Sequence, residues 1–484
     1  MNEPAGASIK PRISEDWLSL WIGLFIFTFS LGALAGWDTM GWGIKTKEWT
    51  ALSQSMAPLS SNYQSLSPVM SLIFTYLFML VVMAAGAWAL RADLVRFACG
   101  FTFIFFIGYA CWLAGHWAHI AATPDKLDKF GISWSLNLTG EAGFILALLA
   151  GLLVGNFTPG LGVMLKECVR PELYIKIAIV IMGGGLGVKA SESGALATNV
   201  MFSGLCSIVV AYLIYWASVY YVARRYFGFS REWAAPLASG ISICGVSAAI
   251  AVGGAIRARP IVPIMVSSLV VIFAVVELVL LPFIARDYLW QEPLVAGAWM
   301  ALSVKTDGAA VASGAIAESL IRAKTLAETG VQYKEGWILM TATTVKMFID
   351  IFIGVWAFLL AVIWSTKIDV EKGVKVSVAE IWGRFPKFVI GYVFTFFFLL
   401  ILCRMAPEMR DAAKLASSEA NTFRVLFFVL TFFTIGVVSN FKKLWEEGIG
   451  KLALLYFISL FGFIIWIGLA IAWIFFHGLT PPVA

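Results

Sequence analysis

The chain has 484 residues, of which 60% are hydrophobic and 13% charged, and its mean hydropathy is +0.87. Soluble domains carry about 25% charged residues, so this composition excludes an ordinary soluble protein and predicts an all-α polytopic membrane protein. The net charge of +6 is spread over short loops, which argues against nucleic-acid binding. The six cysteines show no CxxC spacing, which excludes a disulfide framework and a zinc site of that type.

Thirteen apolar runs are long enough to cross a bilayer. In chain order they cover residues 17–36, 68–90, 94–114, 138–156, 171–188, 197–222, 233–256, 261–285, 294–317, 337–364, 388–405, 422–440 and 452–477. Lys and Arg in the loops favour a cytoplasmic N-terminus and an external C-terminus. The sequence therefore predicts a multi-pass protein of the bacterial inner membrane, whose first run is retained as a helix and not cleaved as a signal peptide.

The runs from residue 138 onward divide into two sets of five, in 138–286 and 287–484, after an N-terminal module of three helices in 1–137. Small and polar residues interrupt the fourth run of each set, at 240–245 and at 434–440. An odd number of spans per set inverts the second set relative to the first. The pattern therefore predicts a ten-helix core of two inverted five-helix repeats with crossed discontinuous helices.

The first interruption is rich in glycine and serine, with Ser239, Gly240, Ser242, Gly245 and Ser247. Unwound backbone at membrane depth must line a cavity or be buried in protein, and half-helix N-termini present amides that hold anions. We expect these residues to bind a substrate anion. Tight helix packing through small residues is the alternative.

A second group of polar residues, Lys305, Thr306 and Asp307, lies inside an apolar run. Acids within membrane spans are costly and are functional candidates by default. We expect Asp307 to carry a proton for coupling and the other two residues to contact substrate. The alternative for Lys305 is a structural charge pair with Asp307.

Lys346 and Asp350 are four residues apart in another apolar run, so they share one helix face and can pair directly. We expect Asp350 to form such a neutralised pair. Lys346 could also supply the positive charge that a divalent anion requires.

Ser439 and Asn440 end the second interruption, and we expect them to complete the substrate site from the opposite repeat. The alternative is a helix C-cap at the membrane edge. His116 and His119 stand beside Trp112 and Trp117, which indicates membrane-interface residues and no metal site.

Four segments resemble the YeiH-type sulfate exporter family. The run from Gly240 to Ala248 is similar to its G-[ST]-x-I-C-G-x-S-A signature, and the weaker matches are Glu141 to Asn156, Val345 to Met347 and Phe385 to Tyr392. The resemblance covers roughly 138–478. It implies the fold of the cation:proton antiporter and anion transporter superfamily, with inverted repeats and two crossed broken helices, and it implies a role for Lys346 as the family's lysine.

Two positions depart from the family pattern. Thr306 stands where the family usually has a histidine, and Ile349 stands where it usually has an arginine. These differences change the protonation chemistry and the charge balance of the site. We therefore carry over the fold of the family and not its sulfate substrate.

Together these features predict a secondary transporter, and not an enzyme, that exports a small inorganic or sulfur-containing anion. No GxxxxGK[ST] motif is present, so H+ or Na+ coupling is expected, without a cofactor; a homodimer is compatible with the sequence. One alternative is a cation:proton antiporter that uses Asp307. A membrane-embedded enzyme and a channel are less favoured, because the chain has only three histidines and because paired interruptions fit alternating access better.

Overall fold

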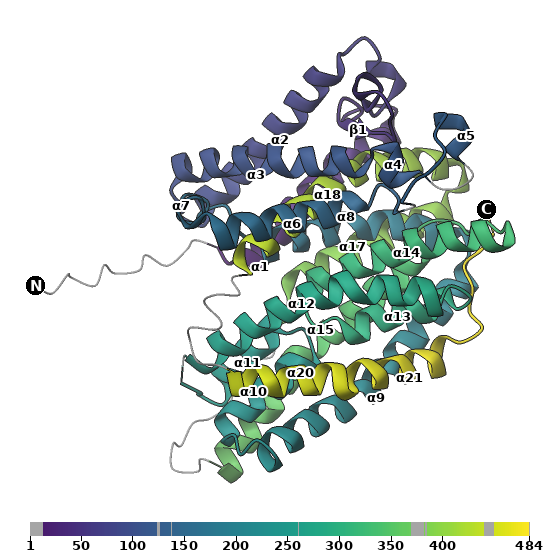
Figure 1. Cartoon of the computed structure of the whole chain (residues 1–484). Coiled ribbons are helices and arrows are strands. Elements are labelled where there is room, and N and C mark those ends of the chain that lie inside the picture. The colour runs from purple at the N-terminus through teal and green to yellow at the C-terminus, as the bar shows by residue number, and fades with distance from the viewer. Residues whose placement is uncertain are drawn as a thin grey trace, which may run out of the picture.

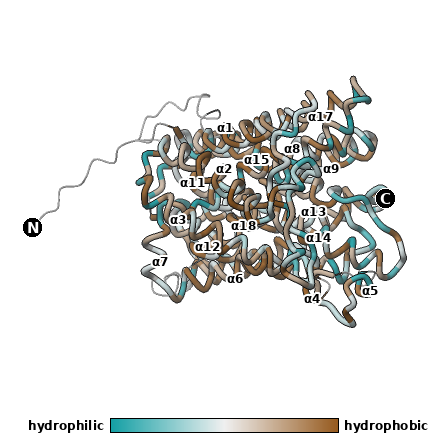
Figure 2. The backbone as a smooth tube through the Cα atoms, turned by 90° about the horizontal axis from the view of Figure 1, so that it is seen from above, coloured by the Kyte–Doolittle hydropathy of each residue, from teal (hydrophilic) through white to brown (hydrophobic). Residues whose placement is uncertain are grey.

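The computed structural model describes residues 13–122, 126–136, 138–259, 261–368, 382, 385–439 and 450–483. Within these ranges the chain is almost entirely helical, and one small antiparallel sheet pairs β1 (Ile44–Thr46) with β2 (Met56–Pro58). Ten of the described helices are long and apolar enough to cross a membrane, and three further apolar helices are shorter. The protein is a multi-pass membrane protein, as predicted. Figure 2 shows apolar residues along the helices and hydrophilic residues gathered near α5 (Leu127–Phe130) and the C-terminus.

The helices form two bundles that lie one above the other in Figure 1, and each helix packs mainly within its own bundle. The upper one, here called the glycine-packed bundle, contains α1 (Glu15–Ser30), α2 (Pro68–Ala89), α3 (Leu94–Gly115), α6 (Ala142–Phe157), α8 (Pro171–Glu192), α17 (Lys387–Met405) and α18 (Arg410–Val438). The lower one, here called the hairpin bundle, contains α9 (Gly194–Arg225), α10 (Arg231–Ser242), α11 (Val246–Ala255), α12 (Ile261–Tyr288), α13 (Pro293–Ser303), α14 (Asp307–Thr329), α15 (Trp337–Ile363), α20 (Gly450–Ser459) and α21 (Ile465–Phe476).

Glycines bring the backbones of the glycine-packed bundle into direct contact. A Cβ atom on Gly187 of α8 would lie 2.1 Å from the carbonyl oxygen of Phe396 on α17. One on Gly151 of α6 would lie 2.0 Å from the carbonyl oxygen of Phe433 on α18. Small residues allow this close approach between helices in membranes, which explains the glycine-rich sequence of α8.

Helix α1 is tied to this bundle by charge. Asp16 accepts a 2.9 Å hydrogen bond from the ammonium of Lys176 on α8, and its second oxygen accepts one of 3.0 Å from the backbone N–H of Lys387 at the start of α17. We call the face on which α1 begins the N-terminal face, and the face on which α21 ends the C-terminal face (Figure 1).

The predicted break at residues 240–245 is confirmed, but the broken segment does not cross the molecule. Helix α10 ends at Ser242 and α11 begins at Val246. The far ends of the two helices meet, because the backbone N–H of Arg259 donates a 2.7 Å hydrogen bond to Glu232. The pair therefore enters and leaves on the N-terminal face as a re-entrant hairpin, here called hairpin 1.

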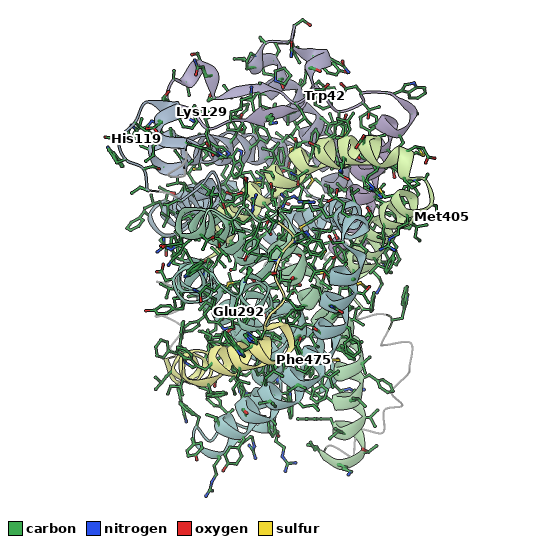
Figure 3. The ribbon with its side chains drawn as sticks, turned by 90° about the vertical axis from the view of Figure 1, so that its right-hand side faces the viewer. Trp42, His119, Lys129, Glu292, Met405 and Phe475 are labelled. Carbon is green, nitrogen blue, oxygen red and sulfur yellow. The ribbon has the colours of Figure 1, made fainter. Side chains whose placement is uncertain are left out.

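A second break lies at Val304–Thr306, between α13 and α14. The start of α13 and the end of α14 both lie on the C-terminal face. Lys324 of α14 forms a 3.6 Å ion pair with Asp287 in the last turn of α12, the helix that leads into α13. Glu292, just before α13, accepts a hydrogen bond from the C-terminal tail at Gly478. We call α13 and α14 hairpin 2; Figure 3 looks onto this face, with Glu292 in the hairpin bundle.

Two predictions are therefore corrected. The second interruption, predicted at 434–440, does not break the described part of this segment: α18 continues to Val438, and the Thr434 and Ser439 hydroxyls donate hydrogen bonds to the carbonyls of Leu430 and Ile435 on the same helix. The discontinuous helices do not cross, because each turns back to the face from which it entered. The thirteen apolar runs all fall on helices, and two of them, 233–256 and 294–317, fold as hairpins.

Candidate functional site

The tips of the two hairpins touch inside the hairpin bundle. A Cβ atom on Gly245 would lie 2.6 Å from the carbonyl oxygen of Lys305. The ammonium of Lys346 on α15 joins both tips, donating hydrogen bonds to the carbonyl oxygens of Ile243 at 3.1 Å and Val304 at 3.3 Å. Since α10 and α13 end at these carbonyls, Lys346 neutralises two helix C-termini at once.

Local sequence explains each tip. Gly245 has a φ of +65°, a backbone conformation that residues with a Cβ atom rarely adopt. At the other tip the Thr306 hydroxyl accepts a 3.2 Å hydrogen bond from the N–H of Ala309, which caps α14. Asp307 then lies in the first turn of α14, where a negative charge is favoured by the helix dipole.

Five buried charged side chains gather around the tips. Asp307 lies 3.8 Å from the Lys346 ammonium. Glu277 of α12 accepts a 3.2 Å hydrogen bond from the backbone N–H of Lys305. The Lys305 ammonium turns away from the tip, donates to the carbonyl of Leu302, and lies 4.6 Å from the ring centre of Tyr215. The fifth group, Asp350, is fully buried on α15.

Asp350 is not the partner of Lys346 that the sequence predicted. In the described part of the chain the ion pair of Lys346 is with Asp307, and neither oxygen of Asp350 has a hydrogen-bond partner. Helix spacing allowed a pair within α15, but the break in hairpin 2 brings Asp307 to the ammonium instead.

One oxygen each from Asp307 and Asp350 and the thiol of Cys244 lie within 4.8 Å of one another. This spacing would suit a metal ion, but the Lys346 ammonium beside Asp307 already supplies a positive charge there and repels another cation. We therefore treat the trio as two carboxyl groups facing a thiol at the tip of hairpin 1.

The predicted serines occupy different positions. The Ser239 hydroxyl accepts a 2.9 Å hydrogen bond from the indole of Trp216, and the Ser242 hydroxyl donates one of 2.5 Å to the carbonyl of Ala238. Both bonds serve packing inside the bundle. Ser247 lies in the first turn of α11 and is half-buried, and Gly240 faces the carbonyl oxygen of Gly245 across hairpin 1.

Ser439 lies away from the tips, at the end of α18 in the glycine-packed bundle. Its hydroxyl bonds to Ile435, and its carbonyl accepts a 3.0 Å hydrogen bond from Asn156 of α6. Its assignment to the site is corrected, because α18 does not break. Asn440 lies outside the described residues.

Hairpin 2 also borders the other bundle. A small cavity of about 20 Å³ lies between its tip residues Thr306 and Gly308 and the side chains of Glu172 on α8 and Thr431 on α18. Sequence reasoning missed Glu277, although a lone acid in an apolar run was a usable signal.

Comparisons with known proteins agree on one family. The model of the family described as conserved hypothetical protein 698 matches residues 131–455. The UPF0324 membrane protein NE0724 of Nitrosomonas europaea is 43% identical over 474 residues, which cover 97% of each chain. An uncharacterized protein of Archaeoglobus fulgidus is 52% identical over 163 residues, 30% of this chain and 87% of that protein. No solved structure matches.

Proposed function

The chain belongs to the UPF0324 family of membrane proteins, and from that premise we propose that it is a secondary transporter whose substrate, a small sulfate- or sulfite-like oxyanion, binds at the hairpin tips. The observation that carries the proposal is the tip-to-tip contact of two re-entrant hairpins from opposite faces, joined by Lys346. Broken helices that meet inside a bundle are typical of transporter substrate sites.

The division of charges at the tips favours an anion. Lys346 occupies the C-terminal ends of α10 and α13. This leaves the N-terminal turn of α11 for a ligand, and also that of α14 when the Asp307 carboxyl group in it is protonated. Each helix N-terminus acts as about half a positive charge and presents backbone N–H groups. A divalent oxyanion needs more positive charge than these two dipoles provide, and the nearby ammonium of Lys346 supplies the rest.

The two-bundle arrangement supports alternating access. Contacts within each bundle far exceed those between them, and the tip of hairpin 2 borders the interface. We propose that the hairpin bundle slides or rocks against the glycine-packed bundle and so exposes the tips to one face and then to the other.

We further propose that the repeats are inverted and permuted. The first contains α6, α8, α9, hairpin 1 and α12, and the second contains hairpin 2, α15, α17, α18 and α20–α21. Under this correspondence the contact of α8 with α17 maps onto that of α18 with α6, and the contact of α9 with α10 maps onto that of α21 with α13. The hairpin is then fourth in one repeat and first in the other.

Protonation is expected to control anion binding. Three carboxyl groups and two ammonium groups at the site would carry one net negative charge if all were ionised, which repels an anion. Two buried carboxyl groups as close as Asp307 and Asp350 cannot both ionise freely, so we propose that they share one proton and that anion and proton move together. Other titratable and charged groups are close enough to interact electrostatically with this pair: Cys244, Lys346, Tyr212, Lys176, Glu172 and Asp16.

This coupling is compatible with export. A divalent anion that leaves with one proton still carries one negative charge outward. A membrane potential that is negative inside favours this movement by about 2.3 kcal/mol per 100 mV. The export direction, the cytoplasmic N-terminus, the YeiH-type substrate class, the superfamily, the homodimer and the absence of enzymatic activity stay predictions from the sequence.

The second candidate is the cation:proton antiporter. It is favoured by one observation, since the fold adds Asp350 and Glu277 to Asp307 and so supplies more buried acid than the sequence pattern indicated. In that case the carboxyl groups, and not the helix N-termini, would bind the substrate.

Lys346→Gln separates the two candidates. In proteoliposomes we expect this variant to reduce flux of sulfate and sulfite about 100-fold and flux of a monovalent anion about tenfold, as for loss of a buried charged hydrogen-bond donor. Arg224→Gln, on an exposed side chain at the N-terminal face, is the charge-matched control. The cation assignment would replace the anion assignment if Lys346→Gln bound sodium or potassium more tightly than the wild type and if oxyanions stabilised neither of these two proteins.

A further inference from the structure

Two neighbouring cavities, of about 740 and 360 Å³, lie between the two bundles near the C-terminal face. Seven residues line both cavities, so we describe the two together as the vestibule: Trp112, Arg322, Glu335, Leu339, Asn421, Arg424 and Val425. The vestibule contains none of the hairpin-tip residues and is therefore distinct from the candidate site above.

One face of α18 lines the larger cavity with polar side chains. Lys414, Ser417, Asn421 and Arg424 are spaced by three, four and three residues, the spacing that places side chains on one side of a helix. The same helix is buried from Leu426 to Ile435 and, apart from Thr431 and Thr434, apolar there. The polar face is thus confined to the part of α18 that borders the vestibule.

Two donors on this face are buried and unused. The Nη1 of Arg424 and the hydroxyl of Ser417 have no hydrogen-bond partner within the described residues. The guanidinium is nevertheless held in place, because its Nε donates a 2.6 Å hydrogen bond to Asn421 and its carbon lies 4.8 Å from the ring centre of Phe428. A fixed guanidinium with a free arm is prepared to bind an acceptor.

The larger cavity also has an excess of positive charge. Of its described lining residues two are acidic, and both have partners: Glu192 pairs with Lys414 at 2.9 Å and Glu335 with Arg322 at 3.9 Å. The remaining cations of the larger cavity are Lys45, Lys189, Lys334 and Arg424, which form no ion pair in the described part of the chain. The smaller cavity adds Lys126 and the carboxylates of Glu48, Glu141 and Glu318, so the described lining of the whole vestibule has seven cationic and five acidic side chains and stays net positive. Positive charge in a concave site concentrates anions.

We propose that Arg424, Ser417 and Asn421 form a second binding site, in the vestibule, for an oxyanion with at least two acceptor oxygens. Arg424 and Ser417 each offer a free donor, and the Asn421 amide can add N–H donors. The lysines of the larger cavity supply a positive electrostatic potential. Its role as a waiting position between the C-terminal face and the hairpin tips rests on the proposed transport function, but its ability to bind does not.

The test is sulfate binding by the purified full-length protein in detergent without phospholipid, measured by calorimetry at constant ionic strength. We expect two classes of site in the wild type and loss of the tip class in Lys346→Gln. Arg424→Gln should weaken the vestibule class about tenfold or more, as for loss of a charge-assisted hydrogen bond. The sulfate affinity of the vestibule site in Arg424→Lys should lie between those of the wild type and Arg424→Gln, because an ammonium keeps the positive charge but lacks the planar fork of a guanidinium.

Arg410→Gln is the matched control, since Arg410 lies on the same helix and lines neither cavity. If Arg424→Gln does not fold, Ser417→Ala and Asn421→Ala report on the same site. Unchanged sulfate binding in a folded Arg424→Gln protein, or equal loss in Arg410→Gln, would overturn the proposal. Vestibule binding that persists without any oxyanion flux would sink the transport function and leave this site intact.

A lipid phosphate is the other source of the same chemistry. Nanodiscs of phosphatidylglycerol and of phosphatidylcholine distinguish the two sources. If phosphatidylglycerol alone displaces sulfate in an Arg424-dependent manner, the oxyanion is a headgroup phosphate. If sulfate binds equally in both discs, it is a free anion. Displacement that does not depend on Arg424 would count against the site.

Discussion

The two bundles both rely on direct backbone contact, but they use it differently. In the glycine-packed bundle, Gly151 and Gly187 let one straight helix lie against the carbonyl groups of another along its length. The hairpin bundle has such a contact between Gly297 of α13 and Ile338 of α15, but it also brings two helix breaks together, where Gly245 meets Lys305 and buried charges surround the tips. The comparison suggests that one bundle is built for rigid packing, whereas the other gives up continuous helices to place helix ends and charges inside the membrane.

The largest expected effect is on folding of the glycine-packed bundle. Gly187→Leu would force a side chain into the backbone of α17, and overpacking of this severity should destabilise the protein by about 3 kcal/mol or more. Thermal unfolding of the purified protein measures this. Gly254→Ala is the control, because nothing lies within 4 Å of a Cβ atom there. Equal stability of both variants would contradict the packing role.

Gly245→Ala should instead spare the fold and stop transport. The positive φ costs about 1–2 kcal/mol for an alanine. Its Cβ would lie 2.3 Å from Val270 of α12 and 2.6 Å from the carbonyl oxygen of Lys305, so it would displace the tip of hairpin 2. We expect a folded protein with flux below a tenth of wild type. Gly240→Ala, with its nearest neighbour at 3.2 Å, should keep more activity. Normal flux in Gly245→Ala would show that the tip geometry is not needed.

Asp350→Asn sharpens the comparison by testing the charges. If the Asp307–Asp350 pair must hold a proton for an anion to bind, wild-type anion flux rises as the pH falls. An asparagine mimics the protonated form at every pH, so flux should become independent of pH while substrate binding remains. Asp307→Asn should also flatten the profile and, by freeing Lys346 from its ion pair, tighten anion binding. An unchanged pH profile in both variants would assign the pair to structure.

The smallest effects are expected for serines that bond only within their own bundle. Ser439→Ala and Ser239→Ala each remove one hydrogen bond, worth about 1 kcal/mol of stability, and should leave flux within about twofold of wild type. Ser247→Ala, at the start of α11, should reduce substrate affinity more than either. A larger flux defect in Ser439→Ala than in Ser247→Ala would reverse our placement of the site.

Much of this architecture was readable from the sequence. Every apolar run became helical, either as one helix or, in two cases, as a hairpin of two helices, because the bilayer forces backbone groups to bond within their own segment. The break at Gly245 was also readable, since glycine can adopt its positive φ without strain. The buried charges Lys305, Asp307 and Lys346 were recognised because each interrupts an apolar run.

Only the tertiary structure decided how these pieces combine. The break at Val304–Thr306 contains neither glycine nor proline and is fixed by the Thr306 cap and by contact with hairpin 1, so local sequence patterns pointed to Ser439 instead. Whether a broken helix crosses or turns back depends on bonds between its distant ends, such as that of Arg259 with Glu232. Likewise, Lys346 selects Asp307 over its helix neighbour Asp350 because the second hairpin brings that carboxylate to it, and no spacing along one chain segment encodes such a meeting.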